Sequence, residues 1–429
     1  MSSSVNITSP RIGEGYQKIS HPSGLTILLY PMPGFVSAYA LFATNYGSVD
    51  ETFKTQSDSD FVTVPAGIAH FLEHKLFENE EGDAFVRYAK TGASANAYTS
   101  FDKTAYLFSC TAHFEESLDI LLDFVSRPYF SPQTVEKEQG IIGQEIKMFE
   151  DSPDWRVLFN LLGALYHHNP VRIDIAGTVD SIAKIDADLL YRCYNTFYNL
   201  HNMTLAVAGN FDPDVVLKAA DRHLKAAPPV EILRQNPPEP WEIKESFVTQ
   251  NLPVAQPLFL VGFKGVPGKD ERENLWGKIA DEVLIDIVAG DSSPLYRKLF
   301  DDGLINQSFE GEGMANRDYS LVFYAGESRD PEKVREALVD EIKRLGQEGI
   351  PPEVFARVKK AVYGRYMGMY GRPDAIGGLL IAAQFAGCDA YEPLEMLAGL
   401  TLEQITNRLA TSLDPSRCAL SVVRPAQSK

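Results

Sequence analysis

The sequence has few cysteines, no long apolar run and no excess of positive charge, and each shortage excludes a class of protein. Its four cysteines lie far apart without C-x-x-C spacing, which is typical of neither a disulfide framework nor a thiolate zinc site. No stretch reaches the roughly 18 consecutive apolar residues that a membrane span needs. The net charge of −18 disfavours nucleic acid and anionic membranes as partners, because both attract positive surfaces.

The N-terminal segment MSSSVNITSPRIGEGYQK lacks the basic start and apolar stretch of a secretory signal. The chain is therefore expected to be cytoplasmic, with its cysteines reduced. What the sequence does have is the composition of a folded globular protein, with 45% hydrophobic and 23% charged residues. Its 429 residues are enough for about two or three domains.

A proline-rich segment, AAPPVEILRQNPPEPWE at 226–242, divides the chain into two nearly equal halves. We expect an N-terminal domain at 1–226, a linker at 227–242 and a C-terminal domain at 243–429. Each half alternates β-like runs with amphipathic helices, which predicts an α+β fold with a mixed sheet packed against helices. Similar orders of elements follow the helices expected near 67–79 and 272–289, which favours a duplication over two unrelated domains.

The most informative segment is GIAHFLEHKLFE at 67–78. On a helix, His70 and His74 lie one turn apart, so both imidazoles can reach one metal ion, and Glu73 lies beside them. This is the inverted H-x-x-E-H arrangement of a zinc peptidase helix. The helix is apolar almost all round and should be buried, where a divalent cation would satisfy these polar side chains. The alternative is a core helix whose polar groups are satisfied by neighbouring side chains.

A third ligand is predicted in the helix within TVEKEQGIIGQEIKMFEDSPDW, residues 134–155. Glu138 and Glu145 are seven residues apart and point in nearly the same direction, on a face shared with Ile141 and Ile142. Carboxylates on an apolar face are costly unless a positive partner lies there. We assign Glu145 as the third ligand and Glu138 as the acceptor that orients a ligating histidine. A buried salt bridge to Arg or Lys is the competing interpretation, and Glu150 is an alternative ligand with a poorer helical phase.

Three side chains that can bind one metal ion, with a further glutamate beside them, predict metal-assisted hydrolysis. A bound Zn²⁺ would polarise a carbonyl and activate water, and Glu73 would act as the general base. The ligand types favour zinc over manganese or cobalt without excluding those metals.

With HFLEH at 70–74 and the glutamate helix about 70 residues later, the sequence resembles the pitrilysin or insulinase family of metallopeptidases. It is most similar to the branch with short subunits that includes mitochondrial processing peptidase. The resemblance implies two homologous α/β-roll-like domains that form half of a clamshell, and cleavage of short or unfolded peptides. The segment GASANAYTS at 92–100 resembles the family's substrate-binding edge strand, with Asn96 and Ala97 as contact residues. From the residues alone, a plain interior strand is the alternative.

The sequence departs from the family in its second half. Active members carry an Arg and a Tyr after a segment similar to SPLYRKLF, whereas this chain has Phe300 and Gln307 at those positions. Similarity to heterodimeric bacterial relatives therefore implies a homologous partner that lacks zinc ligands and supplies the pair, with a homodimer as the fallback. The predicted function is a zinc-dependent endopeptidase subunit. A non-catalytic scaffold subunit of the same fold is the main alternative, and another zinc hydrolase is a third.

Overall fold

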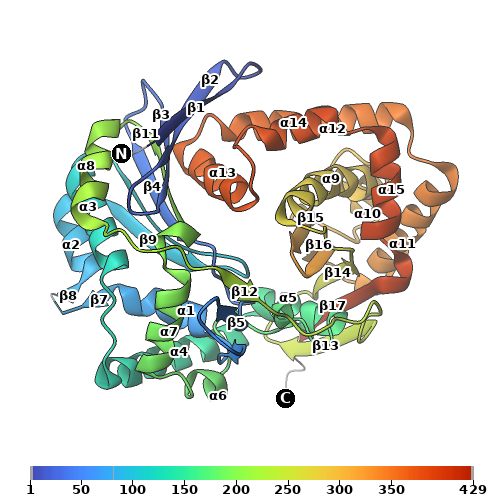
Figure 1. Cartoon of the computed structure of the whole chain (residues 1–429). Coiled ribbons are helices and arrows are strands. Elements are labelled where there is room, and N and C mark those ends of the chain that lie inside the picture. Colours follow the sequence, from blue (N-terminus) through green and yellow to red (C-terminus); the bar gives the residue numbers. More distant parts are fainter. Residues whose placement is uncertain (1–2, 81, 427–429) are drawn as a thin grey trace. The chain divides into compact units, whose positions relative to one another are not determined.

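The computed structural model describes residues 3–80 and 82–426, which fold into two compact units (Figure 1). The first unit contains the chain up to residue 146 together with 174–236 and 368–391. The second contains 147–173, 237–367 and the chain from 392 onward. The predicted linker at 227–242 separates the segments that form the two main sheets. Each unit also takes one segment from the other half of the sequence, so the exact domain limits stay a prediction.

The first unit is built on a seven-stranded sheet in which β3 and β11 are parallel and the other neighbouring strands are antiparallel. A three-stranded sheet and a short hairpin complete its strands within the described residues. In order across the main sheet, the strands are β1 (Ser3–Ser9), β2 (Glu14–Ser20), β3 (Thr26–Pro31), β11 (Met203–Gly209), β4 (Ala38–Thr44), β10 (Thr104–Cys110) and β9 (Ser94–Thr99). The smaller elements are β5 (Thr52–Thr55), β6 (Val62–Thr63), β12 (Ile232–Arg234), β7 (Glu78–Asn79) and β8 (Gly82–Asp83).

Side chains alternate along each strand and so point to both faces of this sheet, and other elements cover both faces. In β4, Ala40 and Phe42 belong to the core shared with the N-terminal helices. Tyr39 points to the other face and packs against Gly377 of α13 (Pro373–Phe385), where an added Cβ would lie 2.8 Å from the tyrosine ring. The other helical elements are α1 (Ile68–Leu76), α2 (Ala84–Thr91), α3 (Phe114–Ser126), α4 (Pro132–Glu150), α6 (Val179–Ile182), α7 (Ala187–Phe197), α8 (Pro213–His223) and the 3₁₀ turn η2 (Leu200–Asn202).

The second unit contains a five-stranded sheet with the same pattern as five neighbouring strands of the first. In both sets of five strands, the strand that comes last in the sequence lies between the two that come first and is parallel to one of them. The strands are β13 (Phe247–Leu252), β17 (Cys418–Pro425), β14 (Leu258–Lys264), β16 (Tyr319–Glu327) and β15 (Glu310–Asn316). This shared topology confirms the predicted α+β class with two related domains.

The helices of the second unit show that the two halves exchange one helix each. Leu161 of α5 packs against Gly262 in the second sheet, just as α13 from the second half covers the first sheet. The helical elements are α5 (Pro153–Leu165), α9 (Glu271–Ala289), α10 (Pro294–Asp301), α11 (Pro331–Glu348), α12 (Pro352–Met369), α14 (Glu392–Gly399), α15 (Leu402–Ser412) and the 3₁₀ turns η1 (Pro170–Arg172) and η3 (Pro415–Arg417).

One carboxylate of the predicted linker fastens it to this unit. Glu239 accepts hydrogen bonds from the backbone N–H groups of residues 167, 168 and 169 at 2.8–2.9 Å and from Lys264 Nζ at 2.7 Å. Burial opposes ionisation of this carboxyl, but these donors lower the pKa of Glu239 to about 2.

Across the part of the chain that the structure describes, no helix is both long and apolar enough to cross a membrane. All four cysteines are buried and free of disulfide bonds.

Candidate metal centre

The helix that carries the H-x-x-E-H motif, α1, is held at its start by a close backbone contact. Gly67 precedes the helix with a φ of 90°, and an added Cβ there would lie 2.4 Å from the carbonyl oxygen of Ala176. An added Cβ at Gly177, which has a φ of 76°, would likewise lie 2.4 Å from the carbonyl oxygen of Ala66. Ser181 Oγ also donates to that oxygen at 2.8 Å. Only glycine tolerates both the left-handed backbone and this approach, so the loop at 174–177 fixes the entry to α1.

The predicted ligand side chains lie together in the first unit. Glu145 Oε2 is 3.8 Å from His70 Nε2 and 3.4 Å from His74 Nε2. Zinc bonds of about 2.0–2.2 Å in tetrahedral geometry place ligand atoms about 3.3–3.6 Å apart. Within residues 3–80 and 82–426, these are the only three His, Cys, Asp or Glu side chains whose ligand atoms all lie within 4.8 Å of one another. One separation lies within the range expected for zinc ligands and the other is about 0.2 Å longer, so the three side chains could hold one tetrahedral ion with a fourth position open to water.

The chemistry of these atoms also fits a cation. Glu145 Oε2 is buried and has no hydrogen-bond partner among the described residues, which is costly for a carboxylate oxygen unless a cation binds it. Burial raises the pKa of Glu145, although the charge on His74 opposes the shift. Burial, and secondarily the charge on His74, lowers the pKa of His70 to about 3, so this imidazole is neutral near pH 7. A neutral imidazole is the form that binds zinc.

Glu138 lies behind His74. Its Oε1 is 3.1 Å from His74 Nδ1, and its side chain is 9% exposed. Burial lowers the pKa of His74, but the hydrogen bond with Glu138 and the charges of Glu73 and Glu145 outweigh this and raise it overall. The contact occupies Nδ1 and leaves Nε2 facing Glu145, which is the arrangement that the sequence predicted for Glu138. Its role as an orienting group stays a prediction.

Glu73 lies on the same helix and contacts a residue that the sequence analysis missed. Thr99, the last residue of β9, donates its Oγ1 proton to Glu73 Oε2 at 2.9 Å. Burial raises the pKa of Glu73, while His74 and the Thr99 hydrogen bond act in the opposite direction. The two-residue period of a strand places Thr99 on the same face as Ala97, and that signal was present in the sequence.

Strand β9 is the edge strand that the sequence predicted. It pairs with β10 on one side and stands at the end of the sheet order. Asn96 and Tyr98 are on its exposed face, whereas Ala95 and Ala97 pack against the core. Asn96 Oδ1 accepts from the backbone N–H of Ala97 at 2.9 Å. Within the described residues, no strand pairs with the other edge of β9, which is the condition for strand addition.

A recess of about 540 Å³ opens beside Glu73 and His74, with Asn96 and Ala97 also in its wall. Phe85, which is 47% exposed, stacks on Phe77 with ring centroids 4.5 Å apart. Ile141 lines the recess and is 46% exposed. The expectation that Ile141 shares the buried face of its helix is therefore wrong, because α4 is only partly covered at the rim of the recess.

A second feature that the sequence analysis missed is a fully buried cation next to the motif. Lys75 Nζ contacts Glu78 Oε2 at 2.7 Å, and Lys137 Nζ contacts the other oxygen at 3.3 Å. These contacts, with that of Lys75 as the largest cause, lower the pKa of Glu78. Glu78 and Lys137 line the recess, and the ion pair with Glu78 compensates the charge of the buried Lys75.

The corresponding helix of the second unit, α9, offers carboxylates that are engaged by other side chains. Glu282 accepts from Tyr366 Oη at 2.9 Å, and Asp286 pairs with Arg365 at 2.9 Å. Among the described residues, the one candidate metal-binding group lies in the first unit.

The positions expected to carry the Arg and Tyr pair lie in and after α10. Phe300 is 39% exposed and stacks on Tyr296, with ring centroids 6.0 Å apart. Gln307 is exposed in the loop between α10 and β15. Arg297, the nearby arginine, forms an exposed i,i+4 pair with Asp301 at 2.7 Å. These two positions therefore supply neither the guanidinium of an arginine nor the hydroxyl of a tyrosine.

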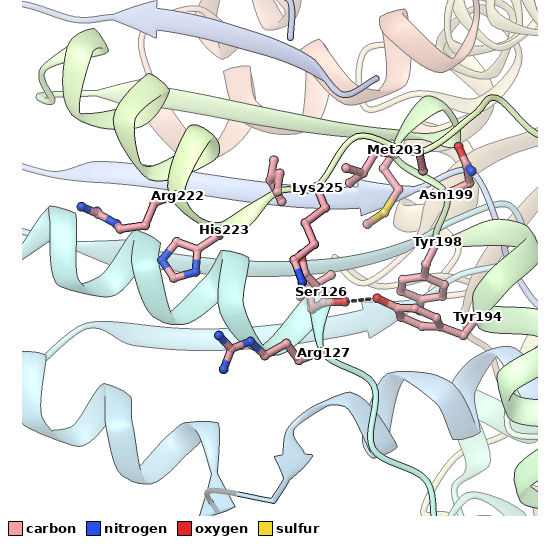
Figure 2. Close-up of a pocket in the computed structure, with 13 residues that line it drawn as sticks. Ser126, Arg127, Tyr194, Tyr198, Asn199, Met203, Arg222, His223 and Lys225 are labelled. Carbon is pink, nitrogen blue, oxygen red and sulfur yellow. Dashed lines mark hydrogen bonds between the residues drawn. The ribbon is translucent and has the colours of Figure 1, made fainter. Parts of the chain in front are cut away.

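A separate pocket of about 270 Å³ contains none of the predicted site residues (Figure 2). It lies where α3, α7 and α8 end, and Figure 2 shows basic side chains from Arg127, Arg222, His223 and Lys225 around it. Arg222 and His223 contact Asp119 at 2.7 and 2.9 Å. Cations near helix C-termini complement the helix dipole, so this cluster is explained by local electrostatics.

Comparison with known proteins gives the same class as the fold and the site. A family model described as "Insulinase (Peptidase family M16)" matches residues 63–179, and one described as "Peptidase M16 inactive domain" matches residues 184–362. The chain belongs to the M16 peptidase family, which confirms the predicted resemblance.

Three relatives illustrate the likeness. The chain is 38% identical over 416 residues to an uncharacterized zinc protease, YmfH, of Bacillus subtilis (strain 168), covering 96% of each chain. It is similar to a crystal structure of an M16-like peptidase from Alicyclobacillus acidocaldarius, with a TM-score of 0.93, 35% identity and coverage of 98% of this chain and 100% of that one. It is also 31% identical over 163 residues to mitochondrial-processing peptidase subunit beta of Caenorhabditis elegans, covering 37% of this chain and 35% of that one.

Proposed function

We propose that this chain is the metal-binding subunit of a zinc-dependent endopeptidase. The observation that carries the proposal is the triangle of His70, His74 and Glu145, whose ligand atoms are spaced for one tetrahedral ion, with Glu73 beside it. The relatives named as zinc proteases support zinc as the metal. The free, buried cysteines are consistent with a cytoplasmic location, which we include in the proposal.

The metal ligands, Glu73 and Glu138 have different roles in the proposed peptide hydrolysis. When bound, zinc would polarise the scissile carbonyl and lower the pKa of a water molecule. Glu73 takes a proton from the attacking water and delivers it to the leaving amine. Glu138 keeps the His74 ring oriented through Nδ1. The buried position of α1 keeps bulk water away from most of the motif.

The substrate in this proposal is an extended peptide. It would add to the free edge of β9, with Asn96 and Ala97 as its main-chain partners. One side chain next to the scissile bond would enter the recess lined by Phe85 and Ile141. This mode selects unfolded or short peptides, because a folded protein does not present a free extended segment.

The test of the general base is Glu73→Gln, which keeps the size of the side chain and removes its basic oxygen. We expect the variant to retain one zinc per chain and to lose about 10²- to 10⁴-fold in turnover of a quenched unstructured peptide. Glu136→Gln, an exposed change on α4, is the matched control and should leave turnover unchanged. A zinc-loaded Glu73→Gln variant with wild-type turnover would sink the assignment.

We further propose that full activity needs a homologous partner subunit without zinc ligands. Phe300 and Gln307 leave the site without the family's Arg and Tyr, and one relative is itself named as a subunit. The purified chain should bind zinc yet cleave the peptide poorly, and adding the partner should restore cleavage. Strong activity of the chain alone would favour a homodimer. Zinc binding without activity in any mixture would favour the alternative, a non-catalytic scaffold subunit.

A further inference from the structure

Thr99 connects the edge strand with the proposed general base. Its hydroxyl has one proton, and the 2.9 Å contact with Glu73 Oε2 uses it, since an ionised carboxylate only accepts. On the other side, Thr104 Oγ1 lies 3.4 Å from Thr99 Oγ1 and donates to the backbone carbonyl of Tyr46 at 3.0 Å. The Thr99 hydroxyl is thus supported by a buried neighbour and directed at Glu73.

The backbone that carries this hydroxyl is itself held in place. Thr99 is paired with Thr104 in the β9–β10 ladder, and Ser100 N–H donates to the carbonyl of Lys103 at 2.8 Å in the following turn. Glu73, in contrast, reaches its carboxylate through several rotatable bonds. A rigid donor on a hairpin can therefore select one orientation of a flexible acceptor.

We propose that Thr99 is a positioning residue that fixes the Glu73 carboxylate, so that the strand proposed to bind the peptide also orients the base. The inference rests on the proposed function for its catalytic consequence. Ala97 and Thr99 are two residues apart on the same face of β9, about 7 Å along the strand. A peptide paired with β9 at Asn96 and Ala97 would stiffen the same strand that holds Glu73. Peptide binding and base orientation are thus coupled through β9.

The test compares two substitutions at this position. Thr99→Val keeps the shape and the β-branched side chain but removes the donor, whereas Thr99→Ser keeps the hydroxyl. With the complete enzyme, we expect Thr99→Val to lower kcat about 10- to 100-fold, with KM and zinc content unchanged. Thr99→Ser should stay within a few-fold of wild type. A kcat for Thr99→Val within twofold of wild type, or equal losses in both variants, would overturn the proposal.

A second readout does not depend on activity. Crystal structures of wild type and Thr99→Ser should show Glu73 in one side-chain conformation, and Thr99→Val should show it displaced or in several. An unchanged Glu73 conformation in Thr99→Val would refute the positioning role. An inactive wild-type enzyme in which Thr99→Val still displaces Glu73 would refute the proposed function and leave the positioning role standing. The two failures are therefore distinguishable.

Discussion

Replacing Glu138 with glutamine should weaken zinc binding without removing a ligand. Glu138 Oε1 lies 3.1 Å from His74 Nδ1, and its negative charge makes the opposite nitrogen of the ring a better donor to a metal. Loss of such a partner typically costs about 10- to 100-fold in metal affinity, or about 1.4–2.7 kcal/mol. Glutamine keeps the volume and one acceptor oxygen, so we expect about a 10-fold rise in Kd.

The assay is a competition titration of the metal-free chain against a chromogenic zinc chelator near pH 7.5. Glu136→Gln removes the same charge from an exposed position of the same helix and serves as the control. The control should keep the wild-type Kd, which separates the His74 contact from a general effect of charge. An unchanged Kd in Glu138→Gln, or an equal loss in the control, would refute the orienting role.

Two further predictions concern stability. Gly67→Ala should destabilise the fold by at least about 2 kcal/mol, because the left-handed backbone is strained and the new Cβ meets the Ala176 carbonyl. Urea unfolding measures this, and a loss below about 0.5 kcal/mol would contradict the packing at the start of α1. Glu239→Gln should cost about 3 kcal/mol at neutral pH, since the pKa of Glu239 falls from 4.5 to about 2 on folding. A depressed pKa gives stability that is present above pH 4.5 and lost as the pH falls through 2. The free energies of unfolding of wild type and Glu239→Gln should therefore converge near pH 2. A difference that does not change with pH would contradict the depressed pKa of Glu239.

Local periodicity was sufficient to predict that the side chains of His70, His74 and Glu145 lie close together. Residues four apart lie on one side of a helix, which places His70 beside His74. Residues seven apart share a direction, which links Glu138 with Glu145. Because a buried carboxylate is costly without a positive partner, the glutamates were expected near a metal ion held by the two histidines. The structure places Glu145 Oε2 3.4 Å from His74 Nε2. The proximity of these side chains could be predicted because it depends on short-range geometry and on the cost of burying charge.

The features that were missed depend on contacts between distant segments. The period of β9 places Thr99 on the same face as Ala97, but its contact with Glu73 also depends on the packing of β9 against α1, which no local pattern encodes. The exchange of α5 and α13 between the units likewise leaves no mark on the helices themselves. Ile141 was assigned to a buried face from its helical phase, but exposure is decided by what lies across from it.

The duplication shows why similar topology gives different chemistry in the two units. Both sheets share one strand order, yet α9 presents Glu282 and Asp286 to Tyr366 and Arg365. In the first unit, the corresponding region brings two imidazoles and a carboxylate together instead. The sheet supplies the scaffold, and a few side chains determine whether the carboxylates pair with internal donors or lie beside two imidazoles.

The most direct test of the metal centre is anomalous X-ray diffraction from crystals of the zinc-loaded chain, collected above and below the zinc absorption edge. We predict one strong anomalous peak per chain, about 2.0–2.2 Å from His70 Nε2, His74 Nε2 and Glu145 Oε2. The peak should remain in Glu73→Gln. A peak at other residues, or no peak in a fully folded, zinc-soaked crystal, would contradict the proposed metal centre and the peptidase function built on it.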